Sequence, residues 1–214
     1  MLELLLVIFS ISILLAVMTG RLIKYINILA VQGFILFLLV LFSYRNLDII
    51  SIIFLTFETL IFKSIMIPYF LRYTIKKNEI SREMQANIPA FYSLIIASII
   101  LIGGFLLSYL LSNTAQHYNI KYFGVSIATI MISLFLILSR KKIITHVMCF
   151  LMLENGIFLL SISISHEMPI LINLAVLLDI FLAVLLLGVF TSHVKVGFDE
   201  LHIDKISVSN GVEE

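Results

Sequence analysis

The sequence predicts an all-α integral membrane protein, a bundle of seven transmembrane helices. Apolar residues make up 61% of the 214-residue chain, whereas a soluble globular domain has about half. Charge-poor runs of about 17–25 residues, the length that spans a bilayer, follow one another along the chain. The seven runs lie at 4–20, 25–44, 49–71, 89–112, 122–139, 143–165 and 169–192.

The runs are continuously apolar and lack the period-two alternation of membrane barrel strands. Because backbone polar groups must be satisfied internally in hydrocarbon, such runs indicate helices. The first run follows Glu3, has no basic residues before it and shows no clear small-x-small cleavage site. It is therefore expected to be a helix and not a cleavable signal.

Basic residues are distributed unequally between the loops. Eleven of the fourteen Lys and Arg residues lie in loops that follow odd-numbered runs, and only Arg45 and Lys121 lie on the other side. The eleven are Arg21, Lys24, Arg72, Lys76, Lys77, Arg82, Arg140, Lys141, Lys142, Lys195 and Lys205. By the positive-inside rule, the N-terminus is outside and the C-terminus is cytoplasmic. A net charge of +1 predicts no nucleic-acid partner, and the basic turn at 140–142 is expected to determine the topology and could also meet lipid phosphates.

The first helix carries no charge, which predicts packing or lipid contact. The second carries Gln32 and Gly33 near its middle. An amide does not titrate, so Gln32 is expected to form hydrogen bonds between helices and not to carry protons.

The third helix holds two opposite charges, Glu58 and Lys63. Five residues turn an α-helix through about 500°, so the two side chains point roughly 140° apart and a direct bond is disfavoured. Each is expected to have a partner on another helix or subunit. The charges could form a static ion pair or a charge relay, and Pro68 could kink the last turn.

The fourth and fifth helices carry no charge. Gly103 and Gly104 in the fourth permit close contact with a neighbouring helix. A charged linker at 72–88 precedes the fourth helix and divides the chain into halves.

The sixth helix contains Glu154, twelfth in a run of twenty-three, followed by Asn155 and Gly156. Glu154 should lie near the middle of a hydrocarbon layer about 30 Å thick. A charge at that depth costs on the order of 2.5–3.5 kcal/mol, so Glu154 indicates a functional proton-binding site. His146 lies about 12 Å away along the helix, either as an interfacial group or as a proton relay to Glu154.

The seventh helix, from Pro169, carries Asp179 at mid-depth, and a polar tail follows at 196–214. Glu58, Glu154 and Asp179 would then form a row of acids accompanied by Lys63, which could pass or store protons. The single Cys149 excludes an intramolecular disulfide and is expected to pack as a small apolar group. The sequence has no cysteine cluster for iron–sulfur, no His pair at haem or metal spacing and no phosphate-binding loop.

The motifs from Lys142 onward have a characteristic order. A basic turn precedes Leu151-x-x-Glu154-Asn155-Gly156, then VLLDIFLAVLLLGVF with the acid Asp179, and finally ELHID at 200–204. This order resembles the three-helix K subunit of bacterial respiratory complex I, whose tail reads N-L-N-I-D, and the C subunit of Mrp-type cation/proton antiporters.

From about Arg21 to Ile206 the chain resembles the hydrogenase-4 component E family. The resemblance rests on TFETLIFKSIMIP at 56–68 and CFLMLENG at 149–156. These proteins are membrane subunits of formate hydrogenlyase and related group 4 energy-converting nickel–iron hydrogenases. Two departures matter. Asp179 stands where the K subunit has Glu, and the position of Glu58 is not always acidic in the family.

The resemblance implies four parts: an N-terminal three-helix half at 1–77, a linker with a connector helix at 78–121, a K-subunit-like module at 122–195, and a cytoplasmic tail at 196–214. It implies a non-catalytic subunit in a bacterial or archaeal cytoplasmic membrane, with Glu154 and Asp179 on a proton path. Antiporter-like membrane subunits and peripheral hydrogenase subunits would be its partners. The nickel–iron centre and iron–sulfur clusters would lie in those partners, with no cofactor in this chain.

Two alternatives remain open at the level of sequence. The chain could belong to an Mrp-type Na⁺/H⁺ antiporter or another complex-I-like ion pump. It could also be a purely structural membrane subunit in which Lys63 pairs statically with the acids.

Overall fold

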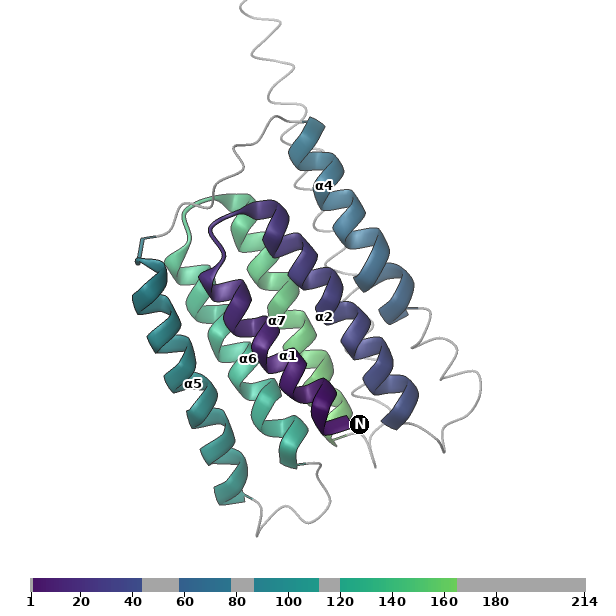
Figure 1. Ribbon diagram of the computed structural model, residues 1–214, viewed down its shortest axis with the longest axis vertical. Helices are drawn as coiled ribbons and strands as arrows, with labels where there is room; N and C mark the ends of the chain where they lie inside the picture. The colour runs from purple at the N-terminus through teal and green to yellow at the C-terminus, as the bar shows by residue number, and fades with distance from the viewer. Residues whose placement is uncertain (1, 44–57, 78–86, 112–119, 165–214) are drawn as a thin grey trace, which may run out of the picture. The chain divides into compact units, whose positions relative to one another are not determined.

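The computed structural model describes residues 2–43, 58–77, 87–111 and 120–164, which are helical except for short turns, with no strand among them (Figure 1). The helices are α1 (Leu2–Met18), α2 (Leu22–Ser43), η1 (Glu58–Met66), α4 (Ile67–Lys77), α5 (Ala90–Leu111), α6 (Ile120–Ser139) and α7 (Ile143–Ile164). They belong to one compact unit of residues 1–175. The all-α class predicted from the sequence is confirmed for these residues.

Four of the described helices are long and apolar enough to cross a membrane. They are Leu22–Phe42, Ala90–Leu111, Ile120–Ser139 and Ile144–Ile164. Helix α1 is apolar but shorter, at 17 residues. These helices are compatible with a multi-pass membrane protein. The total of seven spans and the orientation of the termini stay predictions, and the span expected at 169–192 lies outside the described residues.

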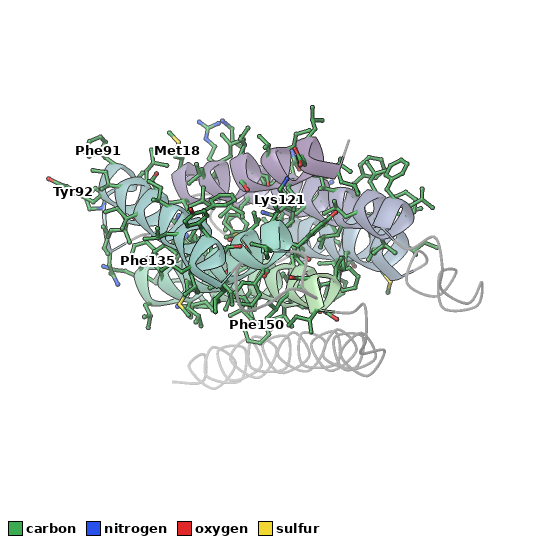
Figure 2. The ribbon with its side chains drawn as sticks, turned by 90° about the horizontal axis from the view of Figure 1, so that it is seen from below. Met18, Phe91, Tyr92, Lys121, Phe135 and Phe150 are labelled. Carbon is green, nitrogen blue, oxygen red and sulfur yellow. The ribbon has the colours of Figure 1, made fainter. Side chains whose placement is uncertain are left out.

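Helices α2 and α7 organise the packing. Helix α2 contacts α1, η1, α4 and α7, whereas α7 packs along α6 and also against α2. In Figure 1, α5 lies at one edge of the described helices and α4 at the other. The apolar span of α7 is 72% buried and that of α5 only 17%, so α7 is an inner helix and α5 a peripheral one. Figure 2 shows Phe91 and Tyr92 of α5 projecting outward, as expected for a helix that faces lipid.

Two contacts define the ends of the bundle. At one end, called here the Arg140 end, the Arg140 guanidinium donates from Nη2 to the carbonyl oxygens of Val17 (3.2 Å) and Thr19 (3.5 Å). These bonds satisfy carbonyls at the C-terminus of α1 and join the α1–α2 turn to the α6–α7 turn. At the other end, the Lys121 end, Lys121 donates to the Glu3 carboxylate.

The third predicted span differs most from its expected form. The sequence predicts an end at residue 71, but the helix continues to Lys77, so that boundary is wrong. The additional turns are held against α2, because Thr74 and Ile75 are buried and Arg72 donates to Asn27 Oδ1 at 2.6 Å. Residues 49–57 lie outside the described part of the chain.

The start of the described third span is also unusual, because η1 is wound as a π-helix over nine residues. Such winding is rare and occurs frequently at functional sites. Pro68 follows directly in α4 and has no N–H to donate to the preceding turn. The π-winding ends at Met66, two residues before Pro68, and the kink expected at Pro68 stays a prediction.

Helices α5 and α6 approach closely at small residues. A Cβ added to Gly104 would lie 2.6 Å from the Gly124 carbonyl oxygen and 2.9 Å from Ala128 Cβ, whereas one added to the neighbouring Gly103 would meet nothing within 4 Å. Of the predicted glycine pair, Gly104 is therefore the residue that permits the contact.

This difference predicts unequal effects of two adjacent substitutions. Gly104→Ala should destabilise the protein by roughly 1–3 kcal/mol because the added methyl group overlaps backbone of α6. Gly103→Ala should be neutral or stabilising by up to about 1 kcal/mol, since it only restricts the unfolded chain. Unfolding of the two variants in the same detergent would measure both effects. Equal losses would contradict the contact.

Candidate functional site

The candidate site lies where η1 meets α7. Glu154 of α7 and Lys63 of η1 are both almost completely buried, with side chains that are 4% exposed. Lys63 Nζ lies 4.0 Å from Glu154 Oε1. This distance allows an ion pair but is longer than a hydrogen bond. Each charge therefore compensates the other without a direct hydrogen bond between them.

Lys63 also contacts an aromatic ring. Its Nζ lies 4.6 Å from the centroid of Phe158, one turn after Glu154 on α7. A ring face attracts a cation at this distance, and more strongly in a site without bulk water. Lys63 is thus held by a carboxylate and an aromatic ring of the same helix, and no sequence pattern indicated the role of Phe158.

Gly33 of α2 makes room for this part of η1. A Cβ at Gly33 would lie 2.9 Å from the Lys63 carbonyl carbon and 3.0 Å from Ser64 N. The Ser64 hydroxyl donates to the Ala30 carbonyl oxygen at 3.3 Å, one turn earlier on α2. The backbone that carries Lys63 therefore rests directly on α2. The sequence placed Gly33 at mid-depth but could not show what approaches it.

A line of hydrogen-bonded polar side chains crosses the bundle beside the charged pair. Asn155 Nδ2 donates to Gln32 Oε1 at 3.3 Å, Gln32 Nε2 donates to Ser12 Oγ at 3.1 Å, and Ser12 Oγ donates to the Phe9 carbonyl oxygen at 2.6 Å. All three side chains are at most 5% exposed. The line connects α7, α2 and α1, and Gln32 makes the interhelical bonds that the sequence predicts for it.

The remaining predicted site residues are separate from this pair. His146 is half-buried on α7, about 12 Å from Glu154 along the axis, so they are not in direct contact. Glu58 begins η1, and its side chain is not among the described ones. Asp179 lies outside the described residues. Within the described ranges, no group of three or more His, Cys, Asp or Glu residues could hold a metal ion.

Cys149 of α7 is buried against Tyr25 of α2. The Tyr25 hydroxyl, fully buried on α2, donates to Met152 Sδ at 3.4 Å and to Cys149 Sγ at 3.7 Å. Thioether and thiol sulfurs are weak acceptors, so this hydroxyl is only weakly satisfied. The contacts agree with the predicted packing role of Cys149.

Glu3 and Lys121 form an exposed pair at the Lys121 end, with side chains 73% and 65% exposed. The hydrogen bond and the positive charge of Lys121 lower the pKa of the Glu3 carboxyl below its usual value. An exposed pair of this kind adds little stability. Glu3 is therefore a suitable control for the buried Glu154.

Comparisons with known proteins give a distant relative. No family model matches the chain, and no solved structure matches it. An uncharacterized protein of Mycobacterium tuberculosis, Rv0085, is 26% identical over 125 residues. The match covers 58% of this chain and 57% of the relative, so the chain spans a little over half of the relative's length.

The mutual compensation of Lys63 and Glu154 can be tested by removing one charge and then both. Lys63→Met should destabilise the protein by about 3–5 kcal/mol, because it leaves Glu154 as an uncompensated buried charge. Adding Glu154→Gln to that variant should recover most of the loss. Thermal unfolding in one lipid–detergent mixture would measure both, with Lys121→Met as the exposed control. A double variant no more stable than the single one would contradict the pairing.

Proposed function

We propose that this chain is a non-catalytic membrane subunit of a complex-I-like energy-converting hydrogenase of the formate hydrogenlyase type. In this proposal it has seven transmembrane helices, with its N-terminus outside and its C-terminus in the cytoplasm. It contributes intramembrane acids to a proton translocation path. The observation that carries the proposal is the buried Lys63–Glu154 pair, 4.0 Å apart.

The chemistry of the pair suits proton storage. With the ammonium and carboxylate both charged, the site is neutral overall. When a proton moves from Lys63 to Glu154, the amine and carboxylic acid are neutral as well. A pair that is neutral in both forms can exchange a proton inside a membrane at a lower electrostatic cost than a single charge. The 4.0 Å separation also leaves Glu154 available to other proton acceptors.

The pair would not act alone. Asp179, which the sequence places at mid-depth on the next helix, would receive or supply the proton of Glu154. Antiporter-like membrane subunits would continue the path. Peripheral partner subunits would hold the nickel–iron centre and the iron–sulfur clusters, and this chain would hold no cofactor. The assembly would lie in a bacterial or archaeal cytoplasmic membrane.

A purely structural role is the second candidate, and the bonds from Asn155 through Gln32 to Ser12 favour it. These groups are neutral amides and a hydroxyl, and together they connect three helices without a titratable member. If Glu154 and Lys63 served the same purpose, the coupling of the complex would not depend on their protonation.

Glu154→Gln separates the two candidates. The amide keeps the size of the side chain but cannot exchange a proton at neutral pH. The assembled complex should therefore keep its subunit composition and lose most of its proton transport. The measurement is acidification or alkalinisation of vesicles that contain the purified complex, with Glu3→Gln as the exposed control. Unchanged transport in Glu154→Gln would overturn the proposed function and favour the structural role.

The companion subunits provide the second test. Purification of the native complex should yield hydrogenase and iron–sulfur subunits together with this chain. A set of antiporter subunits alone, with transport that depends on Na⁺, would instead identify an ion antiporter.

A further inference from the structure

The buried residues around Glu154 differ between the two ends of the bundle. Toward the Lys121 end, Phe158 and Ser161 follow Glu154 on the same face of α7, at four and seven residues. Ser161 is 2% exposed, and its hydroxyl has no hydrogen-bond partner among the described residues. An unsatisfied buried hydroxyl is costly and is usually satisfied by an ordered water.

Helix η1 places a second hydroxyl on the same side. Thr59 precedes Lys63 by four residues and is fully buried. In a helix bonded from i to i+5, residues four apart are close to one turn apart. Thr59 therefore lies on about the same face as Lys63, one turn nearer the Lys121 end. Beyond the charged pair, hydroxyl groups come from both helices that form it.

Toward the Arg140 end, buried leucines lie on the faces of α7 and α4 that continue from the charged pair. Leu151 precedes Glu154 by three residues on its face of α7, and Leu71 follows Lys63 by eight residues in η1 and α4. Their side chains are 4% and 0% exposed. Helix α2 is apolar on both sides of Gly33, with Leu29 and Leu36 buried, so the difference between the ends comes from α7, η1 and α4.

Ser64, next to Lys63, uses its hydroxyl to donate to the Ala30 carbonyl oxygen of α2, and Tyr25 carries a buried hydroxyl in the Arg140 half. The Tyr25 hydroxyl contacts Cys149 and Met152. These two residues precede Glu154 by five and two positions, which places them roughly 140–200° away around α7. The Tyr25 hydroxyl is thus on another side of α7, and its described partners are sulfur atoms. The buried Leu151 also lies between His146 and Glu154 along α7.

We infer that Glu154 exchanges its proton with the Lys121 end of the bundle, along a file of water anchored by Ser161. The inference rests on the proposed function and specifies from which end of the bundle protons reach Glu154. In the exchange, the carboxylic acid of Glu154 loses its proton to a water of the file. The resulting carboxylate is balanced by the Lys63 ammonium, and the excess proton leaves toward the Lys121 end. In this conformation the buried Leu151 and Leu71 lie between the charged pair and the Arg140 end.

The test measures water access directly, without measuring transport. Cys149→Ser removes the native thiol from the full chain, and Ser161→Cys or Leu151→Cys is added in the assembled complex. Leu151 is the matched control because it is similarly buried, at 4% exposed against 2% for Ser161, and lies on the same face, on the other side of Glu154. Since only a hydrated, ionised thiol reacts, a charged methanethiosulfonate reagent should modify Ser161→Cys roughly tenfold or more faster than Leu151→Cys. The reaction should occur when the reagent is added on the Lys121 side of sealed vesicles.

Each outcome decides between the two proposals. Similar slow rates for the two variants, or faster modification of Leu151→Cys from the Arg140 side, would overturn the inference. If Glu154→Gln still abolishes transport in that case, the proposed function stands and only the direction of access is wrong. If Ser161→Cys reacts as expected but Glu154→Gln transports normally, the water file is real and the proposed function is wrong. Val147→Cys, seven residues before Glu154, replaces Leu151→Cys if that variant does not assemble.

Discussion

The compensation of one buried charge by another is the constraint on which the described structure depends. A carboxylate in the middle of a hydrocarbon layer costs on the order of 2.5–3.5 kcal/mol, and an ammonium costs a similar amount. Two opposite charges about 4 Å apart attract by roughly 4 kcal/mol at an effective dielectric constant near 20. The attraction is of the same order as the cost of either charge. The free-energy cost of burying Lys63 and Glu154 together is therefore lower than the cost of burying either charge without the other.

The backbone around the pair is shaped to bring it together. Lys63 lies in a π-helix whose main chain touches Gly33 of α2, and a side chain at position 33 would move η1 away. Close approach of η1 to α2 and of α2 to α7 brings Lys63 within reach of Glu154. The separation of the two charges thus depends on a small residue of a third helix. At 4.0 Å the two charges compensate each other without a direct hydrogen bond.

The sequence predicts where each helix begins and ends better than it predicts which neighbour each face of a helix contacts. The charge-poor runs at 89–112, 122–139 and 143–165 agree with α5, α6 and α7 to within two residues at each end. The argument that Lys63 needs a partner on another helix agrees with its contact to Glu154. The partner itself, the ring of Phe158 and the bond from Gln32 to Ser12 could not be predicted. In a helix that is apolar on all sides, no amphipathic stripe shows which face meets which neighbour. The extension of the helix to Lys77 was not predicted because it depends on tertiary contacts with α2, and no sequence pattern indicated the π-winding of η1.

Three consecutive residues of α7 show how one short motif serves several contacts. Successive side chains of a helix point about 100° apart, so Glu154, Asn155 and Gly156 face three different directions. Glu154 meets Lys63 of η1, Asn155 donates to Gln32 of α2, and a Cβ at Gly156 would lie 3.1 Å from Thr129 Cβ of α6. The amide contact and the glycine contact hold α7 at a fixed rotation between α2 and α6. That rotation keeps the titratable group aimed at η1. The motif therefore separates the group that can exchange a proton from the two that position it, and a substitution at Asn155 or Gly156 would act on Glu154 through the rotation of α7.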